Sequence, residues 1–321
     1  MGIIFSSNFR VRSGRELARL CQKFGLTLNQ ARFPVKIFKI CIHPIAITRH
    51  YILGKQLVAK VSFSDKFTAK DGYDFFDVST MPTGPSIVAL LNRLWKERCS
   101  DGNYSDNMLW RVTRLNDNKD YPTLRNCFYA DDLINYPEIM DFVLDDMFLC
   151  LATKEIGSLP KLSGVTLSWS TQNDLNESSQ LFHLDLEDNK QLKIFVNISN
   201  VELGNGPLTF LSASSTKLVR NALRENAPGN RKHQGQRLTD VVIDEVCGRD
   251  EIKTCIGRSG SGLALNTGRC LHYGSRCRRD DRLVLMFQFV PVNVYREPAF
   301  FGPAFPIKRY VDCPVRTAVL A

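Results

Sequence analysis

The sequence lacks the long apolar runs of a membrane protein and the leader pattern of a secreted one. No stretch approaches the about 18 continuous apolar residues that a membrane span needs. The N-terminus has no basic segment followed by an apolar one, as a secretory signal would have. We therefore expect a cytoplasmic protein with no membrane span. Residues 1–6 match the short myristoylation pattern, which we attribute to chance.

Closely spaced cysteines are also missing. The 10 cysteines are scattered, and none forms a Cys-x-x-Cys pair. This spacing argues against a zinc-ribbon site and against a disulfide-stapled scaffold. We expect most of these cysteines to be reduced and buried, where they pack as small apolar side chains.

Positive charge is present in excess, without a motif that explains it. The formal net charge is +9, from 42 basic and 33 acidic residues. Basic residues gather at 220–237 and again at 276–282. No recognisable DNA- or RNA-binding motif accompanies them, so we expect a small anionic substrate and no nucleic-acid partner. The sequence makes no prediction of the oligomeric state.

The first half of the chain predicts helices with some strands between them. A capping box at 13–16 begins a helix that ends at Gly25. Apolar and β-branched alternation over residues 33–63 predicts strands. Further helices are expected from Ser86 to Cys99, and from Pro137 through Phe148. Their apolar stripes should pack on a sheet.

From Gly164 onward the pattern becomes β. Short strands punctuated by Gly, Asn and Pro are predicted at 165–171, 180–187, 191–200, 207–211 and 282–290. Such a series is typical of a sandwich or jelly roll, so the fold class is mainly β with flanking helices. A polar insertion at 215–257 looks long and structureless, which suits either a lid over a site or a surface excursion without a role.

The chain is long for one compact domain and short for two. Hydrophobic residues make up 44% and charged residues 23%, as in an ordinary globular protein. We expect a single domain over residues 1–321. It comprises a mixed helix and strand support in 1–160, a β core in 161–295 that includes the insertion 215–257, and a C-terminal extension in 296–321.

Two short stretches carry metal-ligand chemistry. In the strand predicted at 180–187, alternate side chains share a face, so His183 and Asp185 point together while Phe182 and Leu184 point away. With His272, they would supply three ligands to one side of an octahedral metal and leave coordination sites open. A lone His-x-Asp recurs easily by chance, so the surrounding sequence matters.

The blocks around these residues extend from about Gly164 to Val290. In order, they are His183-x-Asp185, Leu192–Ile198, Asn205–Leu208, Gly262–Thr267, His272-x-Gly274 and Arg282. In this order and spacing the chain resembles the phytanoyl-CoA dioxygenase family of Fe(II)/2-oxoglutarate oxygenases. The resemblance implies a double-stranded β-helix core, which is the jelly-roll form shared with cupins.

The resemblance also implies a cofactor set and a role for each site residue. Fe(II), the co-substrate 2-oxoglutarate and O2 are expected. His183, Asp185 and His272 would hold the metal and form the catalytic centre. Arg282, ten residues after His272, would hold the far carboxylate of 2-oxoglutarate, because a guanidinium matches a carboxylate at two points. Weaker candidates for polar contacts are Ser275, Lys193 and Ser168, while Arg276, Arg278 and Arg279 compete with Arg282.

The implied activity is hydroxylation, or another oxidation, of an unactivated C–H bond. The substrate would be a small metabolite that is anionic or linked to a carrier or to coenzyme A, and succinate and CO2 would be co-products. Two alternatives stay open. One is a non-enzymatic metal-binding jelly-roll protein that serves as an interaction surface, and the other is a nucleic-acid binder that uses the basic charge.

Overall fold

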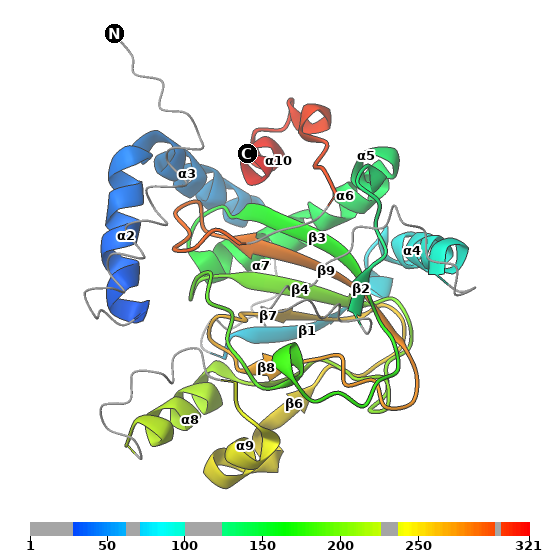
Figure 1. Cartoon of the computed structure of the whole chain (residues 1–321). Coiled ribbons are helices and arrows are strands. Elements are labelled where there is room, and N and C mark those ends of the chain that lie inside the picture. Colours follow the sequence, from blue (N-terminus) through cyan, green and yellow to red (C-terminus); the bar gives the residue numbers. More distant parts are fainter. Residues whose placement is uncertain (1–27, 62–70, 100–123, 226–236, 299–302) are drawn as a thin grey trace.

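A computed structural model describes residues 28–61, 71–99, 124–225, 237–298 and 303–321 of the chain. In these residues two antiparallel sheets form the centre, with helices around them (Figure 1). The larger sheet has the strand order β1-β7-β4-β9-β3-β2. In that order the strands cover Tyr73–Asp77, Ser261–Leu265, Leu192–Asn197, Arg282–Val290, Lys161–Ser170 and Leu124–Asn126.

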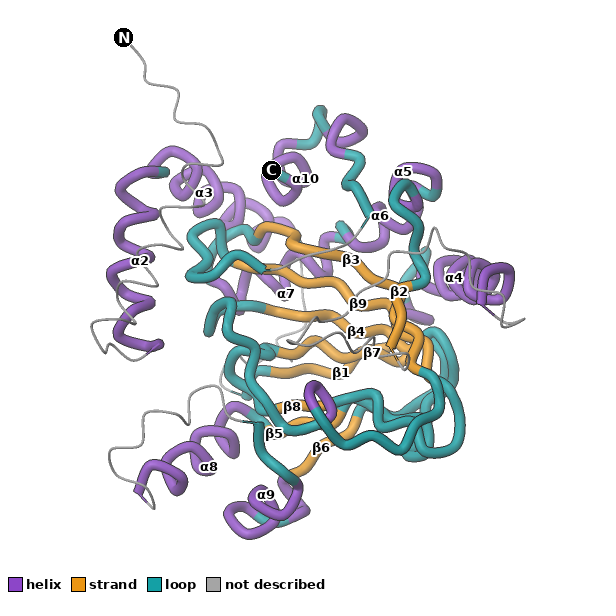
Figure 2. The backbone as a smooth tube through the Cα atoms, viewed as in Figure 1, coloured by secondary structure: helices purple, strands orange, loops and turns teal. Residues whose placement is uncertain are grey.

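The smaller sheet lies beneath the larger one in the tube view (Figure 2). Its order is β6-β5-β8, over Ile252–Thr254, Thr209–Leu211 and His272–Tyr273. Phe210 of β5 packs with Tyr73 and Phe195 of the larger sheet. This cluster joins the two sheets, and we call the face of the larger sheet that meets it the inner face.

The opposite face of the larger sheet forms the main hydrophobic core with the helices. Side chains alternate along a strand, and register aligns them across strands, so Phe287 of β9 lies beside Ile194 of β4. Phe287 is fully buried and makes edge-on contacts with Phe142 and Phe148, at centroid distances of 6.4 and 5.1 Å. The helices that cover this region are α4 (Gly84–Cys99), α5 (Asp132–Asn135), α6 (Pro137–Val143) and α7 (Asp146–Ile156).

The helix predicted for 86–99 is confirmed, and the one predicted from Pro137 is present in two pieces. Asp145 has extended backbone angles between α6 and α7, and its carboxylate accepts a hydrogen bond from the Met147 N–H at 2.8 Å. An aspartate at this position caps a new helix, because it satisfies an N–H that lacks a partner within the helix. The helical spacing of apolar residues continues from α6 into α7, so the sequence does not reveal the break between them.

The strands predicted for 33–63 are wrong. This part of the chain forms α2 (Leu28–Ile42) and α3 (Pro44–Lys60). In α3 the buried residues are His50, Gly54 and Leu57, three or four apart, which is the period of a helix. At Gly54 a β-carbon would lie 2.6 Å from the Leu159 backbone nitrogen, so close packing on the chain after α7 holds α3 in place. Tertiary contact overrides the local preference of β-branched residues for strands.

The insertion at 215–257 is not structureless. It contains most of α8 (Ala213–Glu225), all of α9 (Asp240–Cys247) and β6. Val219 and Ile243 pack with Phe182 and Leu271 in a separate apolar cluster. These helices therefore cover the outer face of the smaller sheet. The centre of the expected lid, 226–236, lies outside the described residues, as does the helix expected at 13–24, so both remain predictions.

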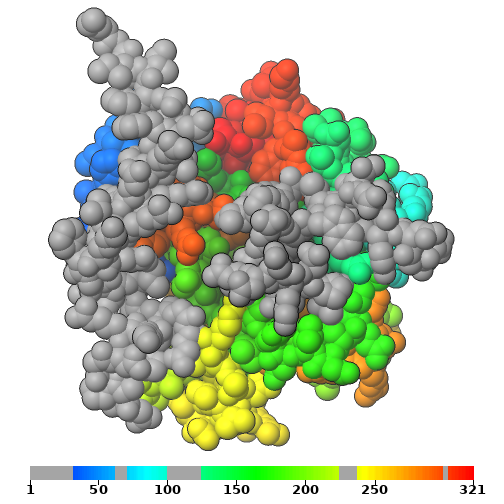
Figure 3. All heavy atoms as spheres, in the orientation of Figure 1, coloured from blue at the N-terminus to red at the C-terminus, as the bar shows by residue number. Residues whose placement is uncertain are grey.

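The C-terminal extension returns to the main core. Helix α10 (Pro314–Leu320) buries Val319 and Leu320 there. Arg309 and Tyr310 both contact the Asp141 carboxylate of α6, each at 2.8 Å. Figure 3 shows this segment, in red and orange, packed beside the green part of the chain.

The described residues bear on the cysteines and on membrane spans. Nine of the cysteines lie there without a disulfide among them, and most are buried. No helix in the described ranges is long and apolar enough to cross a membrane.

Candidate metal centre

The segment that carries His183 and Asp185 is held by isolated pairings and not by a regular strand. The backbones of His183 and His272 exchange both hydrogen bonds, each at 3.0 Å. The Asp185 N–H donates to the Thr267 carbonyl at 3.0 Å. The strand expected at 180–187 is thus wrong as an element, although its alternation survives. Phe182 packs toward α8 and α9, while His183 and Asp185 turn to the interior.

The three predicted ligands come together. Their ligand atoms all lie within 4.8 Å of one another. The Asp185 carboxylate is 3.9 Å from His183 Nε2 and 3.8 Å from His272 Nε2. The other ring nitrogens are engaged elsewhere, since Nδ1 of His183 is 2.8 Å from the Leu181 carbonyl and Nδ1 of His272 is 3.0 Å from the Cys270 carbonyl. A carbonyl partner requires a proton on Nδ1, which leaves each Nε2 lone pair directed at the centre.

Electrostatics keep these groups in the protonation states that a cation needs. Burial lowers the pKa of His272 to about 3 and also lowers the pKa of His183. Burial opposes ionisation of Asp185, but Lys193 and the two imidazoles lower the pKa of that carboxyl below its usual value. At neutral pH the site therefore holds two neutral imidazoles and one carboxylate, which are ready to bind a metal without losing protons.

Lys193 lies beside the metal ligands. Its ammonium group is 2.7 Å from Asp185 Oδ2, and it projects from β4 on the inner face. Burial lowers its pKa, but the carboxylates of Asp185 and Glu187 more than compensate, and its pKa is raised overall. Burial and the nearby Asp185 raise the pKa of Glu187. The lysine thus stays charged and stabilises the Asp185 carboxylate.

Arg282 begins β9 and is 8% exposed. Its Nη2 donates to the Ser275 hydroxyl at 3.1 Å, and that hydroxyl lies 2.9 Å from the hydroxyl of Ser170. No carboxylate forms an ion pair with Arg282 among the described residues, and its buried Nε has no hydrogen-bond partner there. Burial lowers its pKa. A buried guanidinium without an acidic partner is costly, so the site is suited to an anionic ligand.

Ser275 is held in an unusual backbone conformation. Its φ of 65° lies in the left-handed region, which costs a non-glycine residue on the order of 1 kcal/mol or more. The surroundings fix it, because its carbonyl accepts from Gln180 Nε2 at 2.9 Å and from Asn173 Nδ2 at 3.1 Å. This geometry places the Ser275 hydroxyl against Arg282.

The competing arginines are engaged or distant. Arg276 binds the Asp240 carboxylate at two points, 2.6 and 3.0 Å, and stacks on Tyr273. Arg278 donates to the carbonyls of Asn173 and Leu175. Arg279 is exposed. Of the four arginines, Arg282 is the one that is buried on the inner face.

Two serines of β3 complete the inner face. Ser168 lies opposite Val284 in register, and its hydroxyl is 3.1 Å from that of Thr166. Ser170 lies opposite Arg282 and is fully buried. Sequence reasoning proposed Ser168 and missed Ser170. Ser170 is identified by the register of β3 against β9, which places it opposite Arg282. This register cannot be predicted from a single sequence.

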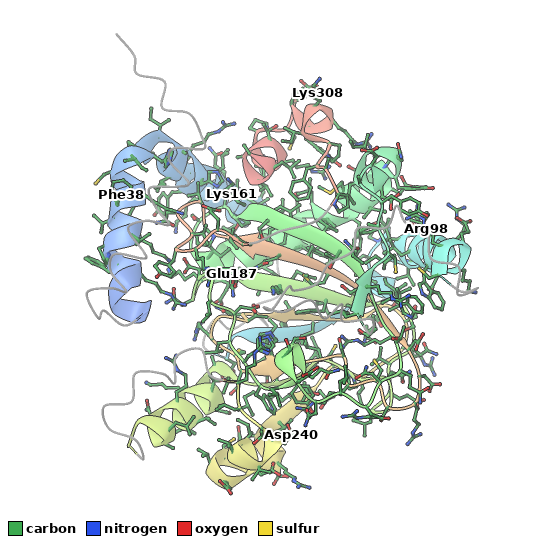
Figure 4. All side chains as sticks on the ribbon, viewed as in Figure 1. Phe38, Arg98, Lys161, Glu187, Asp240 and Lys308 are labelled. Atoms are coloured by element: carbon green, nitrogen blue, oxygen red, sulfur yellow. The ribbon has the colours of Figure 1, made fainter. Side chains whose placement is uncertain are left out.

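The donor set and its surroundings fit a divalent cation with a chelating anion. Two imidazoles and a carboxylate leave part of the coordination sphere open. Each imidazole has its second nitrogen fixed by a carbonyl, and the buried guanidinium of Arg282 offers a counter-charge. Figure 4 labels Glu187, which is close enough to Asp185 and Lys193 to interact with them electrostatically.

No protein-family model matches the chain, and no curated protein matches its sequence. Several solved structures are similar in fold. The epimerase SnoN, described as non-heme and alpha-ketoglutarate dependent, has 14% identity and a TM-score of 0.45, with 75% of this chain and 84% of that chain covered. EctD from S. alaskensis with bound Fe has 14% identity and a TM-score of 0.46, covering 76% and 84%.

HygX from Streptomyces hygroscopicus, with nickel and 2-oxoglutarate bound, has 17% identity and a TM-score of 0.41, covering 70% of this chain and 84% of that one. Because these identities and TM-scores are low, we base the proposals below on the geometry of this chain.

Proposed function

We propose that this protein is an Fe(II)/2-oxoglutarate-dependent oxygenase with a double-stranded β-helix core. The observation that carries the proposal is a pair of complementary features in one interior. His183, Asp185 and His272 form a compact ligand cluster, and Arg282 is a buried cation that has no carboxylate partner among the described residues. The ligand cluster suits a metal ion, and the buried arginine suits the far carboxylate of a dicarboxylate bound to that metal.

His183, Asp185 and His272 would hold Fe(II). When bound there with 2-oxoglutarate, the metal supplies activation of O2 for oxidation of a C–H bond. Asp185 contributes a negative charge that attracts a divalent cation. The carbonyls of Leu181 and Cys270 fix the orientation of the two imidazole rings. This preorganisation reduces the cost of assembling the ligands.

Arg282 and Lys193 serve different parts of the interior. Lys193 lies opposite Gln288 in register, six residues from Arg282 along β9 (288 − 282 = 6), and its ammonium group binds Asp185. The Arg282 guanidinium instead reaches Gly274 and Ser275, which follow the candidate ligand His272 by two and three residues. Arg282, with Ser275, would bind the far carboxylate of 2-oxoglutarate in a two-point geometry. Ser170 orients the Ser275 hydroxyl.

The inner face combines apolar side chains with hydroxyl groups. Phe195 and Met286 lie side by side between the two ends, and Thr166 and Ser168 offer hydroxyls across β3. We propose a small, anionic or carrier-linked substrate, because the chain has a formal net charge of +9 and its interior holds the buried cation Arg282. We further propose that the chain is related to the phytanoyl-CoA dioxygenases, on the order and spacing of its motif blocks.

The test is stoichiometric coupling of co-substrate and oxygen. Purified protein with Fe(II) and 2-oxoglutarate should release succinate as it consumes O2, and Arg282→Met should lower both rates together. Arg279→Met, which changes an exposed arginine in the preceding loop, is the matched control and should leave both unchanged. Metal binding without succinate release or oxygen uptake would instead support a non-enzymatic jelly-roll interaction protein.

A further inference from the structure

Exposed apolar side chains are concentrated on helices α2 and α3. Fourteen large hydrophobic side chains are exposed among the described residues, and six of them lie on these two helices. The six are Phe33, Ile37, Ile40, Ile45, Tyr51 and Ile52. Both helices lie at one edge of the molecule, in blue in Figure 1, and α2 stands apart from the sheets. Apolar residues that gather in this way mark an interaction surface, whereas scattered single ones do not.

Helix α2 turns its apolar side to solvent and its charged side to the protein. Its exposed apolar residues are three or four apart, so they share one face of the helix, and Phe33 is 71% exposed. On the other side, Lys36 binds Asp188 at 2.8 Å and Lys39 binds Glu297 at 3.0 Å. A surface helix of a globular protein ordinarily has the reverse arrangement, with its apolar stripe toward the core. These ion pairs therefore hold α2 with its apolar face outward.

Helix α3 has an apolar centre between two cationic edges. At about 100° per residue, Ile45, Ile52 and Ala59 follow one another along the middle of its exposed face. Ile45 is 85% exposed. Arg49 and Lys55 lie on either side of this line, and both are exposed. Long basic side chains at the edge of an apolar stripe can cover it with their methylene groups while their charges reach a polar layer.

The charge of the two helices has one sign. Residues 28–60 contain six Lys or Arg and no Asp or Glu. Lys36 and Lys39 are bound to carboxylates of the protein, whereas Arg49, Lys55 and Lys60 are exposed. A second copy of the chain docked on this face would bring like charges together. An anionic surface would instead be attracted to it.

We propose that α2 and α3 bind the surface of a bilayer that contains anionic lipids. Such a bilayer offers acyl chains and negative headgroups in one surface, and these match the apolar centre and the cationic edges together. Helices that combine apolar and basic residues in this way lie on a membrane without crossing it. The proposal goes beyond the proposed oxygenase function, because none of these residues belongs to the candidate metal centre.

The experiment is sedimentation of the full-length, metal-free protein with vesicles of phosphatidylcholine, either pure or mixed with phosphatidylserine. Binding to the mixed vesicles is expected in about 0.1 M KCl and should weaken in about 1 M KCl, where charges are screened. Arg49→Gln and Lys55→Gln should each lower the partition coefficient about fivefold, which corresponds to about 1 kcal/mol per cation. Ile45→Ser should lower it about tenfold or more, since an apolar side chain no longer enters the interface.

Leu203→Ser and Arg279→Gln are matched controls on another surface. Leu203 is 73% exposed, Arg279 is exposed, and the Arg279 N–H donates to the carbonyl of the neighbouring Gly204 at 3.0 Å. Both control variants should bind the mixed vesicles as wild type does.

The proposal would be overturned by absence of binding, by equal binding to the two kinds of vesicle, or by equal weakening in the control variants. Dimerisation measured without vesicles and lost in Ile45→Ser would show instead that a second copy of the chain covers this face. Because neither a metal nor 2-oxoglutarate is added, the outcome is independent of whether the oxygenase assignment holds.

Discussion

Replacement of Arg282 by lysine tests the co-substrate anchor in detail. Lysine keeps the positive charge but loses the two-point geometry, so one charge-assisted hydrogen bond is lost. Such a bond contributes about 1.5–3 kcal/mol, and about 1.4 kcal/mol corresponds to a factor of ten in an equilibrium constant. The dissociation constant for 2-oxoglutarate should therefore rise by roughly ten- to hundredfold, measured by anaerobic titration of the Fe(II) protein. The affinity for Fe(II) should not change.

A second replacement separates binding from folding. Arg282→Met removes a buried charge that has no carboxylate partner in the described residues, so the ligand-free protein should be as stable as wild type or more so. At a ligand concentration of about 100 times the dissociation constant, 2-oxoglutarate should stabilise wild type by about 2.7 kcal/mol. The methionine variant should show no such gain in thermal unfolding.

The reasoning would be refuted if Arg282→Lys bound 2-oxoglutarate normally while Arg279→Lys did not. In that case the anchor would belong to the loop before β9.

Three further predictions concern stability. Phe287→Ala should lower the free energy of unfolding in urea by about 3–5 kcal/mol, because it leaves a cavity at a fully buried position. Phe33→Ala, at a position that is 71% exposed, should change the free energy of unfolding by less than about 0.5 kcal/mol. Burial lowers the pKa of His50, so the free energy of unfolding should fall as pH drops below about 6.5. His50→Asn should reduce the slope of the free energy of unfolding against pH by up to about 1.4 kcal/mol per pH unit. An unchanged slope would contradict a buried, neutral His50. Arg98→Met should cost about 3–5 kcal/mol, since it leaves the buried Asp132 carboxylate without its two-point partner, whereas a loss below about 1 kcal/mol would show that the pair contributes little.

The grouping of the candidate ligands was easier to predict from the sequence than the helices and strands around it. His183 and Asp185 are two residues apart in the chain, and His272 belongs to a block of recognisable order, so it could be predicted that these three side chains lie together. Ser170 could not, because its role depends on the register that places it opposite Arg282.

The wrong predictions of secondary structure have a common physical cause. The apolar alternation over residues 33–63 predicts strands, but the chain forms α2 and α3 there, and the helical form of α3 depends on contact between Gly54 and the chain after α7. The polar insertion was read as structureless, although Val219 and Ile243 bury an apolar stripe against the smaller sheet. In both cases distant contacts, absent from any local window, decide the structure.

In the proposed function, His183, Asp185 and His272 hold Fe(II) together with 2-oxoglutarate. The most direct test is the visible absorption of the anaerobic protein on addition of Fe(II) and then 2-oxoglutarate. Wild type should develop a charge-transfer band, and His183→Ala and His272→Ala should each abolish it while His50→Asn retains it. A band that persists in both alanine variants would contradict the assigned site.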